Sequence, residues 1–237
     1  MRRLLSVSGD VMLLPVLGAQ ALWVVSRAMR LPEAAGARSG AVGQGKPLRL
    51  LIVGDSSAAG VGVPDQQMAL AGRLSSRLAK TRRVEWQVLA ASGGTAASTL
   101  RLMREAPGMQ ADVAVVALGV NDTKNGVPIA RWRARYAGLM DLLQDRFGVE
   151  QIIASGLPPL GRFPLLPQPL RGVLGRRAVR FDQVLEQLCE QTAAATFVPL
   201  DLEMNTDQMA PDGFHPGPDI YDAWAGLIAA RLQRTCT

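Results

Sequence analysis

One serine and the only histidine of the chain are the residues whose side chains could do chemistry together. Ser56 ends the tripeptide Gly-Asp-Ser, directly after the apolar run at residues 50–53. A serine hydroxyl is a poor nucleophile at neutral pH unless a base accepts its proton, and histidine is the side chain best suited to that task. The only histidine is His215, in the sequence Asp-Gly-Phe-His-Pro. A serine nucleophile in this chain would therefore have to use His215 as its base.

The alternation of apolar segments predicts a fold that could bring these two residues together. Between the predicted strands, apolar residues recur at helical spacing, most clearly over residues 129–147. Alternating strands and helices imply a parallel sheet with helices on both faces. We therefore expect an α/β protein, a three-layer α/β/α sandwich with a five-stranded parallel sheet of the flavodoxin-like kind. The predicted strands are at residues 50–53, 84–89, 112–118, 151–154 and 196–200.

Small or polar residues follow the first three predicted strands, in turns that contain Ser56, Gly93 and Asn121. Asp212 and His215 lie in a loop after the fifth strand. The carboxyl ends of parallel strands share one edge of the sheet, where ligands bind. Acyl transfer needs a nucleophile, a base, a group that orients the base, and donors for the oxyanion. Residues of all four kinds are present at this predicted edge.

Four short segments in this order resemble the four sequence blocks of the SGNH family of GDSL-type serine esterases and lipases. They are Gly54-Asp55-Ser56, Ser92-Gly93-Gly94-Thr95, Gly119-Val120-Asn121-Asp122 and Asp212-Gly213-Phe214-His215. The resemblance implies Ser56 as the nucleophile, His215 as the base and Asp212 as the acid that orients the base. It also implies an oxyanion hole made by the backbone amides of Ser56 and Gly93 and by the side chain of Asn121. The implied fold is of the SGNH hydrolase type, and the implied protein is a cofactor-free carboxylic ester hydrolase that works through an acyl-enzyme on Ser56.

The residue types agree with these implied roles. Asp212 and His215 are three residues apart, so in a tight turn the carboxylate can hold one imidazole nitrogen while the other faces Ser56. Gly93 suits a backbone amide that must approach substrate without a side chain in the way, and its neighbour Gly94 is the alternative donor. The pattern Gly-x-Ser-x-Gly is absent from the chain, which argues against an α/β-hydrolase.

Other polar residues near these segments have structural interpretations. Ser57 is expected to be a turn or helix-cap residue, and Asp55 and Asp122 are expected to serve in caps and turns. Asp201 and Asp207 are alternative partners for His215, but both are less well spaced from it.

The composition restricts cofactors and partners. Cys189 and Cys236 are the only cysteines, which excludes a multi-cysteine zinc site; whether they pair stays open. No histidine or cysteine cluster accompanies Asp219 and Asp222, so we expect no metal.

A formal net charge of +6 raises the question of nucleic-acid binding. The arginines are scattered among predicted helices, and aromatic residues make up only 5 % of the chain. We therefore expect solvated helix faces that favour anionic lipid, and no nucleic-acid partner.

The chain divides into three predicted segments. Residues 1–30 form an N-terminal hydrophobic segment that could be an anchor, a signal-like segment or a helix packed on the domain. Residues 31–47 are rich in Gly, Ala, Pro and Arg and are expected to be a linker. Residues 48–237 form the hydrolase domain. The apolar segment favours membrane association, through residues 4–25, over a cytoplasmic location.

The segment at residues 157–170 is rich in proline and leucine, and no regular element is expected in it. Leu157, Leu160 and Phe163 could line an apolar acyl pocket or form its lid; the alternative is packing over the sheet edge. Small acyl esters or lipids are therefore the expected substrates, ahead of acetylated sugars. A lysophospholipase or thioesterase would use the same machinery, and a non-catalytic, membrane-tethered binding module is the alternative from another class.

Overall fold

The computed structural model describes residues 13–202 and 205–234. Cys236 and residues 4–12 of the expected membrane segment lie outside these residues. Cys189 is a buried free thiol, and burial raises its pKa to about 12.

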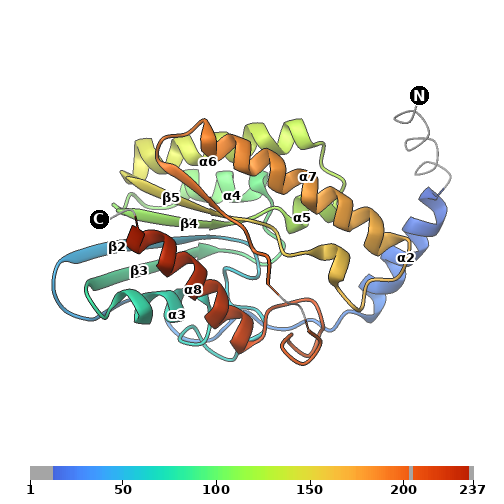
Figure 1. The fold of residues 1–237 in the computed structure, drawn as a ribbon, viewed down its shortest axis with the longest axis horizontal. Helices are drawn as coiled ribbons and strands as arrows, with labels where there is room; N and C mark the ends of the chain where they lie inside the picture. The colour runs from blue at the N-terminus through green and yellow to red at the C-terminus, as the bar shows by residue number, and fades with distance from the viewer. Residues whose placement is uncertain (1–12, 203–204, 235–237) are drawn as a thin grey trace.

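A six-stranded sheet runs through the middle of the described chain (Figure 1). The strands lie side by side in the order β1-β3-β2-β4-β5-β6. Strands β2 to β6 pair in parallel, and β1 pairs antiparallel with β3. The strands are β1 (Ser39–Val42), β2 (Pro47–Gly54), β3 (Arg83–Ala90), β4 (Val113–Ala117), β5 (Gln151–Ser155) and β6 (Ala195–Val198).

The five predicted strands are confirmed as β2 to β6, but the expectation of a five-stranded sheet is wrong. The sixth strand, β1, lies within residues 31–47, which were predicted to be a linker. All four residues of β1 are exposed, so its sequence carries no apolar pattern that would indicate a strand. It is held by backbone pairing with β3, from Ser39 opposite Gln87 to Val42 opposite Val84.

Helices cover both faces of the sheet, as in the predicted three-layer sandwich (Figure 1). On β2, Leu51 and Val53 pack into one apolar core, and Leu50 and Ile52 pack into the other. A strand buried on both faces reads as a continuous apolar run, which explains why β2 was visible in the sequence. One face is covered by α4 (Ala96–Glu105), α6 (Ile129–Phe147) and α7 (Leu170–Glu190), and the other by α3 (Leu70–Leu78) and α8 (Pro218–Arg234).

Helix α6 follows from its sequence most directly. Its buried side chains recur with the helical period, so one side faces the core and the charged residues face solvent. The helix ends at Gly148, which adopts the left-handed conformation (φ 64°) that glycine accepts most readily. The buried side chains are Trp132, Tyr136, Leu139, Met140, Leu143 and Phe147.

The proline-rich segment at residues 157–170 contains only one short 3-10 helix, η1 (Leu160–Arg162), before α7 begins at Leu170. Leu160, Phe163 and Leu166 are nonetheless buried. The segment is therefore a loop whose apolar side chains pack into the core.

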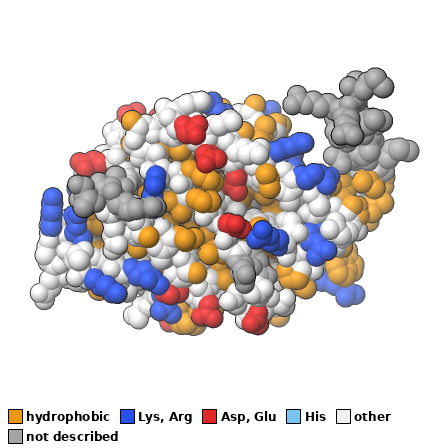
Figure 2. Space-filling view, in the orientation of Figure 1, with side chains coloured by type: hydrophobic (Ala, Val, Ile, Leu, Met, Phe, Trp, Pro, Cys, Tyr) orange, Lys and Arg blue, Asp and Glu red, His pale blue; other side chains and the backbone are white. Residues whose placement is uncertain are grey.

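The N-terminal hydrophobic segment forms helix α2 (Leu14–Arg27). Its Gln20 side chain donates to the Gln168 carbonyl (2.6 Å) and accepts from the Leu170 amide (3.1 Å), so α2 contacts the start of α7. No residue of α2 is buried, and Figure 2 shows apolar side chains at this end of the molecule. Among the described residues, no helix combines the length and the apolar character that crossing a membrane requires.

Tyr221 in α8 ties this helix to the turn that follows β2. Its hydroxyl lies 2.8 Å from the Val61 carbonyl oxygen and 2.9 Å from the Ser57 carbonyl oxygen, and these two oxygens share its proton as acceptors. The substitution Tyr221→Phe leaves the Val61 carbonyl without this partner. We expect the free energy of unfolding to fall by about 1–3 kcal/mol, measured by urea denaturation.

Tyr136→Phe is the matched control, because the Tyr136 hydroxyl is equally buried but makes one long bond of 3.5 Å to the Val116 carbonyl. This variant should lose less than about 1 kcal/mol. Equal losses in the two variants would contradict the role assigned to Tyr221.

Candidate active site

The turn after β2 carries Ser56 beyond the carboxyl end of the sheet. The strand ends at Gly54, where a Cβ atom would lie 2.3 Å from the Ala117 carbonyl oxygen of β4, so only glycine fits. The chain then folds back, with the Val61 amide donating to the Ser56 carbonyl at 2.9 Å. Ser56 is partly exposed at the resulting corner.

The loop before α8 is shaped by Asp212. Its Oδ1 accepts hydrogen bonds from the backbone amides of Phe214 and His215, both at 3.0 Å. Gly213 between them has φ 66°, and the Ala210 amide donates to the His215 carbonyl at 2.9 Å. These bonds fix the backbone of the loop from both sides.

The two segments meet where Gly62 packs against the histidine loop. A Cβ atom on Gly62 would lie 2.3 Å from the Pro216 carbonyl oxygen and 3.3 Å from the His215 Cβ atom. Gly62 also has φ 107°, a conformation that other residues rarely adopt. The close approach of the two segments therefore depends on this glycine.

Ser56, His215 and Asp212 come together at this contact. His215 Nε2 lies 2.9 Å from Ser56 Oγ, and His215 Nδ1 lies 2.5 Å from Asp212 Oδ2. The Asp212 side chain is 2 % exposed and that of His215 is 27 % exposed. One imidazole nitrogen thus faces a buried carboxylate and the other faces a hydroxyl at an accessible surface.

Burial by itself would raise the pKa of the Asp212 carboxyl. The hydrogen bonds from the His215 ring and from the amides of Phe214 and His215 outweigh that effect, so the pKa lies below its usual value. The carboxylate is therefore ionised at neutral pH and can hold the imidazole in one orientation.

The backbone amides of Ser56 and Gly93 make no hydrogen bond within the described chain. By contrast, the Gly94 amide donates to the Ala91 carbonyl at 3.0 Å, so Gly94 is engaged in its own turn. Gly93 has φ 77° and open space where a side chain would be, although it is not among the residues that line the cavity beside Ser56. Of the two neighbouring glycines, only Gly93 has an amide left to donate.

Asn121 connects three strand ends. It lies in the short helix α5 (Val120–Lys124) after β4, and its Nδ2 donates to the Gly94 carbonyl at 2.9 Å and to Asp55 Oδ2 at 3.3 Å. Gly94 follows β3 and Asp55 follows β2. The Asn121 amide is thereby held in one place at the edge of the sheet.

The neighbouring acids make local hydrogen bonds of the kind expected from the sequence. Asp55 Oδ1 accepts from the Ser57 amide (3.0 Å) and the Ser57 hydroxyl (2.8 Å), and Asp122 Oδ2 accepts from the Ala96 amide at the start of α4 (3.0 Å). Burial raises the pKa of both Asp55 and Asp122.

Asp201 and Asp207, the two alternative partners for His215, make no hydrogen bond to it in the structure. Asp201 forms an ion pair with Arg162 at 2.9 Å, and Asp207 is exposed. Neither competes with Asp212 for the imidazole.

A cavity of about 510 Å³ opens beside Ser56 and His215. The three residues predicted to line an acyl pocket, Leu157, Leu160 and Phe163, all line it. Sequence reasoning missed the contribution of α2, whose apolar pattern indicated a helix but not the surface on which it packs. From α2 and the residues just after it come Ala21, Val24, Val25, Ala28 and Met29.

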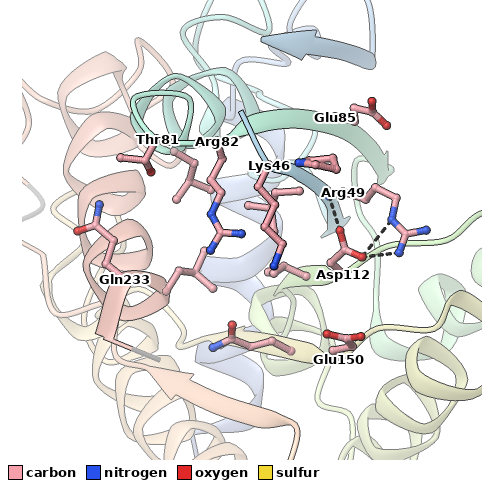
Figure 3. Close-up of a pocket in the computed structure, with 14 residues that line it drawn as sticks. Lys46, Arg49, Thr81, Arg82, Glu85, Asp112, Glu150 and Gln233 are labelled. Atoms are coloured by element: carbon pink, nitrogen blue, oxygen red, sulfur yellow. Dashed lines mark hydrogen bonds and ion pairs between the residues drawn. The ribbon is translucent and has the colours of Figure 1, made fainter. Parts of the chain in front are cut away.

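A second cavity, of about 900 Å³, lies at the opposite edge of the sheet, where β2 begins (Figure 3). Arg49 and Asp112 in its wall pair with each other, with the Arg49 Nε atom 3.0 Å from Asp112 Oδ1. None of the residues predicted to take part in acyl transfer lies there. Ser56, Asn121, Asp212 and His215 instead line the smaller cavity.

A model of the GDSL-like lipase/acylhydrolase family matches residues 52–223. The chain belongs to this family. The match contains Ser56, Gly93, Asn121, Asp212 and His215. No curated protein matches the sequence.

Several solved structures resemble this GDSL-like protein in fold. TesA is 22 % identical with a TM-score of 0.60, over 78 % of this chain and 98 % of its own. The psychrotrophic esterase EstA from Pseudoalteromonas sp., inhibited by monoethylphosphonate, is 20 % identical with a TM-score of 0.58. The match covers 79 % of this chain and 98 % of the EstA chain. Est24, a carbohydrate acetylesterase from Sinorhizobium meliloti, is 14 % identical with a TM-score of 0.57. The match covers 79 % of this chain and 99 % of the Est24 chain. These similarities show a common α/β fold.

Asp182 in α7 holds the first residue of the cavity-lining loop, because its Oδ1 accepts from the Leu157 amide at 2.8 Å. Burial raises its pKa from 3.8 to about 6, against the opposing effect of the Leu157 bond. The folded state therefore holds this proton more tightly than the unfolded state. We expect the free energy of unfolding to decrease as the pH rises from about 4 to about 6, and this contribution to be constant above that range.

Asp182→Asn keeps a hydrogen-bond acceptor for Leu157 but does not titrate. Urea denaturation between pH 4 and pH 7 should show that wild type loses roughly 2 kcal/mol more than this variant across the range. Parallel pH profiles for the two proteins would contradict the buried state of Asp182.

Proposed function

We propose that this GDSL-family protein hydrolyses carboxylic esters through an acyl-enzyme on Ser56. The observation that carries the proposal is the position of the one imidazole, 2.9 Å from Ser56 Oγ on one side and 2.5 Å from Asp212 on the other. Family membership supports an ester hydrolase in general terms. The intact hydrogen-bonded chain favours catalysis over the alternative of a non-catalytic, membrane-tethered binding module.

In the first half of the reaction, His215 Nε2 accepts the proton of the Ser56 hydroxyl as Oγ attacks the ester carbonyl carbon. The charge that develops on the imidazole is stabilised by the Asp212 carboxylate. When the bond to the alcohol breaks, the leaving oxygen takes the proton from His215. The acyl group is then joined to Ser56 Oγ.

In the second half, a water molecule gives its proton to His215 Nε2 and attacks the acyl carbon. The attack forms a tetrahedral intermediate. When its bond to Ser56 Oγ breaks, His215 returns the proton to Oγ and the carboxylic acid is released. Asp212 orients the same imidazole in both halves, so no further base is needed.

The negative charge on the former carbonyl oxygen needs hydrogen-bond donors. We assign this role to the amides of Ser56 and Gly93 and to the side chain of Asn121. The two amides have no partner within the described chain. The longer Asn121 bond, 3.3 Å to Asp55, is the one that a substrate oxygen could displace most easily.

The cavity supports acyl esters with an apolar chain as the substrates. Leu157, Leu160 and Phe163 line it, and most of its surface is apolar. An acyl chain is therefore favoured over the acetylated sugar that the name of Est24 indicates for that protein. Lysophospholipids and thioesters carry acyl chains too and stay alternatives on the same machinery.

Ser56→Ala tests the proposal directly. A fluorophosphonate probe should label wild type and not this variant, and turnover of nitrophenyl esters should fall on the order of 10⁴-fold or more. Ser57→Ala is the matched control: Ser57 bonds to Asp55 rather than to His215, so labelling should persist. A wild type that neither reacts with the probe nor hydrolyses nitrophenyl esters of any acyl length would refute the proposal.

Asn121→Ala tests the oxyanion role. Loss of one such donor should lower kcat by about 10²–10³-fold while KM changes little, because the bond strengthens as charge develops in the transition state. Steady-state kinetics on one nitrophenyl ester give both constants, and a thermal unfolding curve checks that the variant is folded. An unchanged kcat in the folded variant would remove Asn121 from the mechanism.

A further inference from the structure

The exposed apolar side chains of this protein are concentrated on α2. Ten large hydrophobic residues are exposed in the described chain, and six of them belong to α2 or lie just after it. Isolated exposed apolar residues are normal, whereas a contiguous group marks an interaction site. Val25 and Met29 of this group also line the cavity beside Ser56. We call the remaining four, Leu14, Val16, Leu22 and Trp23, the outer surface of α2.

The other side of α2 is apolar as well. Leu17 and Val24 pack against the apolar core that contains Leu160 and Phe163, and Val24 also lines the cavity beside Ser56. A helix on the surface of a protein normally carries polar residues on the side that faces solvent. Because α2 is apolar both toward the cavity and away from it, its outer surface lacks the polar character that contact with water favours.

Positive charge accompanies this apolar surface. Arg27 and Arg30 are exposed at the carboxyl end of α2, and no acidic residue occurs between residues 13 and 30. The Arg27 guanidinium lies 5.1 Å from the centre of the Trp23 ring. Figure 2 shows Lys and Arg side chains beside the apolar group at this end of the molecule. Exposed Trp and Leu next to Arg is the composition of helices that lie in the interface of anionic lipid bilayers.

We propose that the outer surface of α2 docks on an anionic lipid surface. Since α2 is also a wall of the cavity, docking places the cavity against the lipid, and an acyl chain can pass beside α2 toward Ser56. This second step rests on the proposed ester hydrolysis, whereas docking does not. The substrate class is thereby narrowed to acyl esters that reside in a membrane surface.

The binding test uses the full chain and flotation with phosphatidylcholine vesicles, with and without phosphatidylserine. Wild type should bind the phosphatidylserine vesicles more tightly than the neutral ones, and added salt should weaken this preference. The double variant Leu22→Ser, Trp23→Ser should bind them at least about tenfold more weakly, because two apolar anchors are lost. Neither residue lines the cavity.

Leu227→Ser is the matched control, since Leu227 is also exposed but lies on α8. It should bind vesicles as wild type does. No vesicle binding by wild type, or equal binding by wild type and the double variant, would overturn the proposal. Self-association of wild type that the double variant loses, without vesicle binding, would overturn it in favour of a second copy of the chain as the occupant.

A kinetic readout separates docking from hydrolysis. The ratio of the rate on nitrophenyl palmitate embedded in the vesicles to the rate on soluble nitrophenyl butyrate should fall about tenfold in the double variant and stay constant in Leu227→Ser. An unchanged ratio would overturn the proposed route from the lipid. Failure of wild type to hydrolyse even the soluble ester would instead count against the proposed function, and the vesicle-binding result would be unaffected.

Discussion

The interaction on which the rest of the site depends is the pair of hydrogen bonds made by one imidazole. His215 is 159 residues from Ser56 in the chain, and the hydrogen bond between them exists only because the sheet edge and the loop before α8 meet. Their contact is close-packed: Gly62 leaves no room for a side chain beside Pro216, and Tyr221 fastens α8 to the same turn. A small displacement of the two segments would separate the two side chains, because the length of a hydrogen bond varies by only a few tenths of an ångström.

A buried polar network supports the site from below. Asn121 joins the turns after β2, β3 and β4 through its bonds to Asp55 and Gly94, and Asp55 in turn accepts from Ser57. Burying such groups without partners would be costly, whereas a connected network fixes one arrangement. The network therefore makes the three strand ends act as a single rigid frame, on which the loop of Asp212 and His215 is placed.

The central strands, and the contact of His215 with Ser56 and Asp212, could be predicted from the sequence. The physical reasons for this also set the limits of the prediction. Strand β2 is buried on both faces, and α6 repeats its apolar residues at every turn, so both leave periodic patterns. Strand β1 leaves none, because all four of its residues are exposed and none has to be apolar. The choice between Gly93 and Gly94 depends on one backbone hydrogen bond to Ala91, which no residue type encodes. The surface on which α2 packs could not be predicted either, since the hydrophobic effect is non-directional and does not specify which surface a helix covers.

The most direct test of the central claim is the proton NMR spectrum of the imidazole, because the chain has a single histidine and the assignment is unambiguous. A hydrogen bond from Nδ1 to the buried Asp212 carboxylate predicts one far-downfield proton resonance in wild type. In a folded Asp212→Asn variant, that resonance should disappear. A wild-type spectrum without this resonance, or one in which it persists unchanged in Asp212→Asn, would contradict the arrangement of His215 between Asp212 and Ser56.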